Sequence, residues 1–254
     1  MIKDNLIRIK SILFKLLPCK LKIKLTVFKN RFFKIPRDLK PSNKKVKKTI
    51  IILGVGRSGT SMLSEIIQDF GVNIGWDLIE ANEFNKRGHF ENKLFVQMND
   101  KLLALTEGTW DFPPIEEEIF KLINNIKLME EIKRLVRSQE DELWGWKDPR
   151  TILTISLYLP FLVNPFFIVI HRNKDAVAKS LNRTGFQIER GLKLCDEYKR
   201  RLRDFLSKNK YPVLELNYED FFKNPKKQIN KIKNFLGIKK DINHSIIDKR
   251  LKHF

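Results

Sequence analysis

The stretch that most constrains the fold is TIIILGVGRSGTSML, residues 49–63. An apolar run ends abruptly in a turn with three glycines, and a helix-like pattern follows it. A continuous apolar run is typical of a fully buried parallel strand, so we expect strand, turn and helix in that order. The free N–H groups and the dipole at the start of such a helix attract an anion. The stretch therefore predicts an anion site at the carboxyl end of a first strand.

The glycine spacing follows the P-loop pattern except at one position. In that pattern, glycine, four residues and glycine precede a lysine that contacts the outer phosphates of a nucleoside triphosphate. Gly54 and Gly59 keep the spacing, but Thr60 stands at the lysine position. We expect the glycines at 54, 56 and 59 to permit positive φ and close approach of a phosphate, although a purely structural turn is an alternative. The candidate anion-binding residues are Arg57, Ser58, Gly59, Thr60 and Ser61.

From residue 49 onward, short apolar runs alternate with helical patterns, which predicts an α/β fold with helices packed on a mostly parallel sheet. The expected strands are 49–53, 143–146, 166–170 and 213–216. The expected helices are 60–70, 92–106, 115–138, 150–159, 174–182, 189–208 and 225–236. A chain of 254 residues with 42% apolar residues can bury one sizeable core.

Two further strand ends carry charged residues. Arg172 follows the buried run FFIVI, and Ser180 comes eight positions later within the next helix. Ligands bind at the carboxyl ends of parallel strands, so Arg172 and Ser180 are candidates to hold a phosphate beside the glycine loop, unless Arg172 closes a salt bridge. Lys147, in LWGWKDPRT, ends another expected strand and is a candidate catalytic cation. A helix start alone explains the Asp and Pro that follow it.

The first 48 residues form a basic segment. They hold 16 Lys and Arg against two Asp, a net charge of +14, and the remaining 206 residues carry only +6. Residues 1–17 have an amphipathic helical pattern, KLKIKLTVF (20–28) reads as a short strand or a second interfacial element, and residues 36–48 read as a linker. A basic amphipathic helix can lie on an anionic membrane, so residues 1–35 are a candidate membrane contact, and packing on the domain or on a partner is the alternative. We therefore predict an arm at 1–48 and a domain at 49–254.

The number and spacing of the cysteines indicate a reducing compartment. The two cysteines, Cys19 and Cys195, have no disulfide or metal-ligand spacing, so we expect a cytoplasmic protein without a metal. No apolar run approaches the roughly 18 residues that span a bilayer, and the amino terminus lacks the centre of a signal peptide.

Taken in order, these stretches resemble the sulfotransferases that use 3'-phosphoadenosine-5'-phosphosulfate (PAPS), particularly bacterial ones. The loop for the 5'-phosphosulfate is similar to GVGRSGTSML. The family's 3'-phosphate motif is similar to VIHRNKDAVAKS, which places Arg172 and Ser180 at its Arg and Ser positions. A late strand end of the family is similar to LELNYEDFFKNP, which implies that Tyr218 lies near the adenine. WKDPR and NKRGHFEN are also similar to family segments. The resemblance covers residue 49 to the carboxyl end and implies a P-loop-type three-layer α/β/α fold. PAPS has no γ-phosphate, which agrees with the missing lysine.

The resemblance also implies the catalytic roles. Arg57 and Lys147 would neutralise the transferring sulfuryl group, and a base after the first helix would take the acceptor proton. We favour Glu91 as that base, although it could instead only favour the start of a helix. His89 is a second candidate, because the ordinary pKa of histidine, near 6.5, suits a general base. The alternative is that His89 is a surface residue of a glycine turn. The other candidates for the base are Glu83 and Glu80. Arg250 and Lys252 resemble a closing segment over the cofactor, or belong to a solvated tail.

The leading interpretation is therefore a PAPS-dependent sulfotransferase that acts on a hydroxyl acceptor. The saccharide of a bacterial surface glycan is the expected acceptor, with possible assembly at the inner face of the cytoplasmic membrane. Acceptor specificity is expected from residues 76–145 and 184–212. A P-loop kinase that uses ATP with magnesium is one alternative. A noncatalytic protein that binds nucleic acid or lipid through its basic arm, and an inactive family member, are the others.

Overall fold

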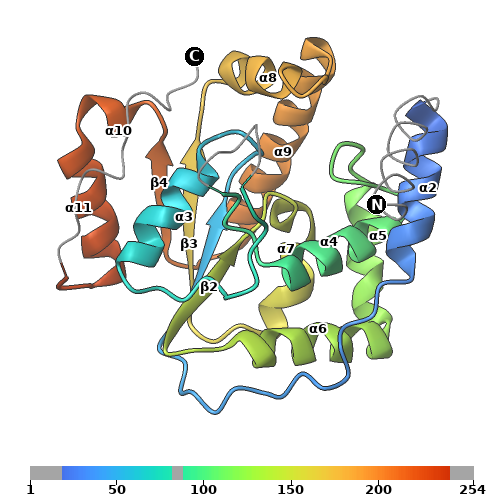
Figure 1. The fold of residues 1–254 in the computed structure, drawn as a ribbon, viewed down its shortest axis with the longest axis horizontal. Helices are drawn as coiled ribbons and strands as arrows, with labels where there is room; N and C mark the ends of the chain where they lie inside the picture. Colours follow the sequence, from blue (N-terminus) through green and yellow to red (C-terminus); the bar gives the residue numbers. More distant parts are fainter. Residues whose placement is uncertain (1–18, 82–87, 241–254) are drawn as a thin grey trace, which may run out of the picture.

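The computed structural model describes residues 19–81 and 88–240, and its core is a four-stranded parallel sheet (Figure 1). The strand order is β2-β1-β3-β4. The strands are β1 Lys48–Leu53, β2 Leu143–Lys147, β3 Pro165–His171 and β4 Val213–Asn217. Because all three pairings are parallel, the four carboxyl ends lie at one edge of the sheet.

Helices cover both faces of the sheet, so the domain has three layers (Figure 1). Helices α3, α10 and α11 pack on one face, and α4, α6, α7 and α9 cover the other. The helices are α2 Cys19–Arg31, α3 Thr60–Asp69, α4 Lys93–Leu105, α5 Glu116–Lys121, α6 Ile126–Gln139, α7 Thr151–Tyr158, α8 Lys174–Asn182, α9 Ile188–Lys208, α10 Asp220–Lys223 and α11 Pro225–Leu236. Short 3-10 turns occupy Leu122–Asn124 and Leu159–Phe161.

The central strand β1 is buried on both faces, as its continuous apolar run requires. Ile51 and Leu53 point into one core with the aromatic residues of β2, whereas Ile50 and Ile52 point into the core under α3 and α11. Beneath the first of these faces, the rings of Phe95 and Trp146 stack at 4.2 Å. The sheet is therefore rigid where its strand ends carry polar residues.

The predicted α/β fold is confirmed, with a few differences in the elements. The four expected strands and most expected helices agree with the structure to within two residues. The single helix expected at 115–138 was wrong, because the chain breaks at Asn125, whose side chain caps α6 by accepting from Leu128 N at 3.1 Å. The short helix α10 was not expected.

The segment before residue 48 differs most from expectation. KLKIKLTVF lies in helix α2 rather than in a short strand. Helix α2 packs against α4, Arg31 Nε donates to Ala104 O at 3.0 Å, and Ile35 is buried in the main core. Residues 36–47 contain neither helix nor strand, as the linker pattern predicted. The amphipathic helix expected at 1–17 lies outside the described residues.

Candidate active site

The loop between β1 and α3 has the shape of an anion cradle, but its glycines act differently from expectation. Positive φ angles occur at Arg57 (71°) and Gly59 (97°), and not at Gly54 or Gly56. Gly54 is needed for close packing, since a Cβ there would lie 2.8 Å from Ser58 Oγ. Gly59 is needed for both reasons, since its φ is positive and an added Cβ would lie 2.2 Å from the Tyr218 ring.

This loop offers a phosphate the buried Ser58 hydroxyl and the first N–H groups of α3, whereas the Ser58 backbone N–H already donates to Val55 O at 3.0 Å. Gly59 is the N-cap of α3 and supplies no side-chain cap, so the first N–H groups of α3 are not capped by that residue. The Ser58 hydroxyl is buried and has no hydrogen-bond partner among residues 19–81 and 88–240. A buried hydroxyl without a partner is costly, and an anion accepting from it would remove that cost. The loop residues therefore fit a bound phosphate or phosphosulfate group.

Thr60 and Ser61, the remaining predicted residues of the loop, begin helix α3. Thr60 is buried, and its methyl group packs where Gly54 leaves room. Ser61 Oγ donates to the backbone oxygen of His89 at 3.2 Å. This hydrogen bond joins the glycine loop to the segment that holds the predicted catalytic base.

A cluster of three arginines surrounds Ser180 beside this loop. Arg57 Nε and Arg183 Nη2 both donate to Ser180 Oγ, at 3.1 and 2.9 Å. Arg172 Nη1 donates to Arg57 O at 2.9 Å, and its guanidinium lies 4.4 Å from the centre of the Tyr218 ring. The structure thus brings together Arg57, Arg172, Ser180 and Tyr218, which lie far apart in the sequence.

The electrostatics of this cluster favour an anion. Burial, followed by the charges of Arg183 and Arg172, lowers the pKa of Arg57. Burial also lowers the pKa of Arg172, against the opposing effect of Tyr218 and Glu219. An anion placed among these groups would relieve the repulsion between like charges. Arg183 was not among the predicted residues, although its position three residues after Ser180 on α8 could have indicated it.

Lys147 and Glu91 form a buried ion pair at the end of β2. Lys147 Nζ lies 2.6 Å from Glu91 Oε1, and the two side chains are 1% and 10% exposed. Glu91 is held by its backbone, whose oxygen accepts from Ile79 N, and by the following residue Asn92, which caps α4. Two residues predicted separately as cation and base are therefore in direct contact.

The pair shifts the pKa of both partners. Burial raises the pKa of Glu91, but the charges of Lys147 and Arg150 outweigh it and hold that pKa below its usual range. Burial lowers the pKa of Lys147, and Glu91 only partly offsets this effect. Glu91 is thus ionised at neutral pH, and Lys147 is a buried cation close to the cradle edge.

Arg150 connects this pair to a second layer of polar residues that sequence reasoning missed. Its guanidinium contacts Asp100 Oδ1 at 2.7 Å, Asp148 Oδ1 at 2.8 Å and Glu91 Oε2 at 3.6 Å. Burial would lower the pKa of Arg150, but the charges of Asp148, Asp100 and Glu91 raise it above its ordinary value. Arg150 therefore stays charged and orients Glu91 from the side opposite to Lys147.

Asn99 of α4 forms hydrogen bonds with residues of this layer. Its amide nitrogen donates to Asp148 Oδ2 at 2.8 Å, and its amide oxygen accepts from Thr154 and Tyr158. Burial raises the pKa of Asp148, although Arg150 opposes the effect. No local pattern marks Asn99 or Asp100, because their role depends on α4 packing against α7. Asp148 and Arg150 lie within LWGWKDPRT, the stretch that also contains Lys147.

The other base candidates are placed less favourably. His89 is half-buried, and burial, with the charges of Lys147, Arg57 and Arg150, lowers its pKa although Glu91 raises it. Glu80 is exposed, and Glu83 lies outside the described residues. Arg250 and Lys252 also lie outside them. Among residues 19–81 and 88–240, no group of three or more His, Cys, Asp or Glu side chains is arranged to hold a metal.

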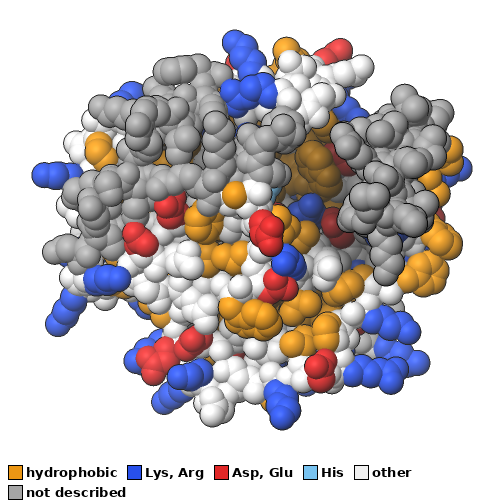
Figure 2. Space-filling view, viewed as in Figure 1, with side chains coloured by type: hydrophobic (Ala, Val, Ile, Leu, Met, Phe, Trp, Pro, Cys, Tyr) orange, Lys and Arg blue, Asp and Glu red, His pale blue; other side chains and the backbone are white. Residues whose placement is uncertain are grey.

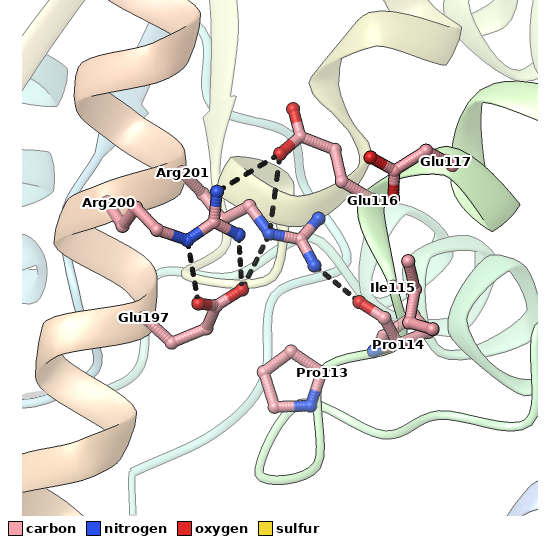
Figure 3. Close-up of a pocket in the computed structure, with 8 residues that line it drawn as sticks. All are labelled: Pro113, Pro114, Ile115, Glu116, Glu117, Glu197, Arg200 and Arg201. Carbon is pink, nitrogen blue, oxygen red and sulfur yellow. Dashed lines mark hydrogen bonds and ion pairs between the residues drawn. The ribbon is translucent and has the colours of Figure 1, made fainter.

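The surface of the molecule has two concavities. One face of the molecule is hollowed near its centre, and basic, acidic and hydrophobic side chains are visible inside the hollow (Figure 2). A second concavity, a pocket of about 260 Å³, lies between the start of α5 and the middle of α9 (Figure 3). Arg201 donates there to Glu197 at 2.7 Å and contacts Glu116 at 3.7 Å. None of the predicted site residues lines this second pocket.

Comparison with known proteins identifies the family and the fold. A profile of the sulfotransferase family matches residues 49–241. The sulfotransferase STF9 of Mycobacterium avium has a similar structure, with a TM-score of 0.53 and 12% identity, over 80% of this chain and 67% of that one. The sulfotransferase domain of the Synechococcus PCC 7002 olefin synthase has a TM-score of 0.51 and 19% identity, over 84% and 82%.

A third similar structure is the sulfotransferase STF1 of Mycobacterium tuberculosis H37Rv. Its TM-score is 0.51 at 11% identity, over 79% of this chain and 70% of that one. A sequence search among curated proteins finds no match. At these identities the similar structures establish the fold, and the profile establishes the family. No helix in the described part of the chain is long and apolar enough to cross a membrane.

Proposed function

The chain belongs to the sulfotransferase family, and we propose that it transfers the sulfuryl group of PAPS to a hydroxyl group of its acceptor. The observation that supports this proposal is that two adjoining groups of hydrogen-bond donors share Arg57. One is the cradle at the start of α3, and the other is the arginine cluster around Ser180. A donor with phosphate at both its 5' and 3' positions needs two such groups.

Different residues of the site would bind different groups of the donor. The loop from Arg57 to Ser61 would hold the 5'-phosphosulfate, with the buried Ser58 hydroxyl as one donor. Arg172, Arg183 and Ser180 would hold the 3'-phosphate through charged and neutral hydrogen bonds. The Tyr218 ring, which packs on Gly59 and under Arg172, would border the adenine. When bound, PAPS supplies an activated sulfuryl group.

Lys147 and Glu91 would carry out the proton and charge steps. Glu91 is ionised and can accept the proton of the acceptor hydroxyl at a carboxylate oxygen. Lys147 keeps Glu91 ionised and places a buried positive charge next to the cradle. A charge fixed in a buried site stabilises developing negative charge far better than water does. Arg150 keeps the carboxylate in position when Lys147 is drawn toward an anion.

Glu91 is the preferred base and His89 the alternative. Glu91 has the better geometry, since Lys147 and Arg150 fix both of its carboxylate oxygens. His89 has a lowered pKa and is neutral at physiological pH, which a base also requires. Glu80 is exposed and lacks comparable fixing contacts among the described residues. General base catalysis of this kind contributes roughly 100- to 10,000-fold to the rate.

A saccharide is the proposed acceptor. The two regions expected to select it meet in one aromatic cluster, in which the Arg190 guanidinium lies 4.1 Å from the centre of the Phe112 ring and 4.5 Å from that of Phe186. Trp110 stacks on Phe186 at 5.7 Å, and Asp111 pairs with Arg190. Apolar rings beside charged hydrogen-bonding groups fit a ring that carries several hydroxyls. Assembly of surface glycans at the inner face of the cytoplasmic membrane is part of the same proposal.

The other candidate functions make different predictions. A kinase would need a group for the outer phosphate of ATP, and Thr60 occupies the position of the P-loop lysine. A noncatalytic protein held by its basic arm would bind polyanions with steep salt dependence and without a small nucleotide. An inactive family member would bind the donor product without turning over PAPS.

The test is calorimetric titration of the full chain with 3'-phosphoadenosine-5'-phosphate, compared with ATP and magnesium. We expect the bisphosphate to bind more tightly than ATP. Arg172→Ala should weaken that binding at least tenfold, about 1.4 kcal/mol, because the arginine would hold the 3'-phosphate. Arg203→Ala, an equal loss of charge at an exposed position of α9, should change it less than about twofold.

Three results would oppose this proposal. A preference for ATP with magnesium would support the kinase. Absence of binding by either nucleotide would leave the noncatalytic interpretation. Equal weakening by Arg172→Ala and Arg203→Ala would mean that the bisphosphate is attracted only by net charge, and not held by the cluster around Ser180.

A further inference from the structure

Helix α2 has a second apolar face that the domain does not cover. Its inner face packs on α4 and buries Val27. Leu21, Leu25, Phe28 and Phe32 are exposed, by 43%, 43%, 66% and 65%. Their spacing of four, three and four residues places them within an arc of roughly 60° at about 100° per residue. These four residues, the α2 outer face, form one continuous stripe.

The charges around this stripe have one sign. Residues 19–35 contain no Asp or Glu, and they contain six basic residues. These are Lys20, Lys22, Lys24, Lys29, Arg31 and Lys34. On the helical wheel, the exposed Lys24 lies on one side of the α2 outer face and the exposed Lys29 on the other. Long lysine side chains can extend from such positions toward anionic groups while their methylenes cover apolar surface.

We propose that the α2 outer face binds the surface of an anionic lipid bilayer, with its four apolar side chains in the boundary between headgroups and acyl chains. An apolar stripe flanked by lysines is the pattern of helices that lie in this interface. The rings of Phe28 and Phe32 contact each other edge to face at 5.1 Å, so they would enter as one unit. Hydrophobic side chains are exposed along the edge of the molecule where α2 lies (Figures 1 and 2).

Charge argues against the other occupants of this face. A second copy of the chain would bring its own lysine-flanked stripe, and like charges would repel across the contact. Residues 1–18 carry four Lys or Arg against one Asp, so they too would add positive charge. Nucleic acid would pair with the lysines but would leave four apolar side chains without apolar partners. An anionic bilayer satisfies both the charges and the stripe.

This inference is independent of the proposed reaction. It concerns a helix on the side of the domain, joined to α4, and none of the donor or base residues belongs to it. A sulfotransferase held at a membrane would meet lipid-linked or membrane-bound acceptors at high local concentration. The membrane contact would stand even if the chain bound no PAPS.

The experiment is co-sedimentation of the full chain with lipid vesicles. One set is phosphatidylcholine alone, and the other contains about a third phosphatidylglycerol. We expect at least tenfold stronger partitioning onto the anionic vesicles, and a loss of binding as salt is raised. The double variant Phe28→Glu with Phe32→Glu should weaken partitioning at least tenfold, because it places two carboxylates in the α2 outer face.

The matched control makes the same chemical change elsewhere. Ile123→Glu with Ile126→Glu also adds two carboxylates at exposed apolar positions, 45% and 79% exposed, away from α2. We expect this pair to weaken partitioning less than about threefold. Circular dichroism should show that both variants are folded, as expected for changes at exposed residues.

Several outcomes would overturn the proposal. They are no partitioning onto anionic vesicles, equal weakening by both pairs of substitutions, or equal binding to the two vesicle sets. Light scattering, which measures the oligomeric state, could give another such outcome. It would show that the chain is a dimer and that the double variant Phe28→Glu with Phe32→Glu is a monomer. In that case the α2 outer face would be a contact between copies, and not a membrane surface.

Discussion

The buried pair of Lys147 and Glu91 is the residue-level feature that most sets this site apart. Removing two charges from water is costly, and the cost is offset only when the geometry is good and the remaining oxygens are bonded. Here Arg150 forms an ion pair with the second carboxylate oxygen at 3.6 Å, and Asp100 and Asp148 balance Arg150. Each charge of this site is therefore paired with a neighbouring charge, and removing one of them leaves another charge buried without its partner.

This network predicts the effect of Glu91→Gln on stability. The substitution leaves the Lys147 cation buried without its partner, so we expect the free energy of unfolding to fall by about 3 kcal/mol at neutral pH. The folded pKa of Lys147 is already below 10.5 and would fall further. The loss relative to the wild type is complete below the folded pKa of the variant and shrinks as pH rises through the folded pKa of the wild type, because Lys147 is then neutral in both folded proteins. Urea unfolding at several pH values measures it.

Glu107→Gln is the matched control. Glu107 pairs with Arg31 at 2.9 Å, but its side chain is 82% exposed. An exposed pair contributes little, so this variant should lose at most about 0.5 kcal/mol with no pH trend of the same size. Similar losses for the two variants would show that the Lys147–Glu91 pair is not buried as the structure has it.

At the scale of elements, local sequence signals explain most of the fold. Apolar runs placed the four strands, and capping residues mark the helix starts. Asn92, Asn125, Asn173 and Asn224 each accept from a backbone N–H in the first turn of the helix that follows. The cap at Asn125 was overlooked, which is why α5 and α6 were predicted as one helix. Apolar periodicity continues across this break and conceals it.

The pairing of β1 with β2 leads to a prediction about Gly145. A Cβ atom at Gly145 would lie 1.7 Å from the backbone oxygen of Ile50, a contact that the paired strands cannot relieve without separating. Gly145→Ala should therefore lower the free energy of unfolding by about 3 kcal/mol or more, or prevent folding. Thermal unfolding followed by circular dichroism measures the change.

Gly56→Ala tests whether this effect is specific. Gly56 lies at the same sheet edge, its φ is not positive, and the nearest atom to an added Cβ is 4.0 Å away. We expect it to change stability by less than about 1 kcal/mol. If Gly145→Ala were as stable as Gly56→Ala, the strands could not pair in the register found here.

At the scale of the whole molecule, the basic segment is not separate from the core throughout its length. Ile35 is 2% exposed and belongs to the cluster that contains Phe95 and Trp146. Its backbone N–H donates to Glu131 of α6 at 3.1 Å. The charge run therefore describes composition better than it describes packing, because in the described part of this segment Val27 and Ile35 are buried among the basic residues.

Ile35→Ala tests how far the segment folds with the domain. Truncating a fully buried isoleucine leaves a cavity, so we expect a loss of about 3 kcal/mol in the free energy of unfolding. The exposed Leu21→Ala should cost less than about 0.5 kcal/mol. Denaturant unfolding should show one transition for both variants. An unchanged midpoint for Ile35→Ala would support an arm that is independent of the domain.

The sequence predicted one half of the candidate site better than the other. Arg57 and Arg172 could be proposed in advance, because each follows a recognisable strand and parallel strands end at one edge. Ser180 could be proposed from its place in the helix after Arg172, and Tyr218 from the resemblance to the family. The contact between Lys147 and Glu91 could not, since it depends on how the segment before α4 crosses over β2. Asn99 and Asp100 carry no local signal that separates them from ordinary helix residues, and only the spacing of Arg183 from Ser180 could have indicated Arg183.

The sequence by itself determined the order of strands and helices and the residues at the strand ends, because these depend on apolar runs, glycine turns and caps within short windows. Tertiary structure decided which of those residues meet. Packing of α4 and α7 on the sheet placed three carboxylates around Arg150, and packing of α2 on α4 decided which of its two apolar faces is buried. Such contacts join residues far apart in the chain, so only the folded arrangement reveals them.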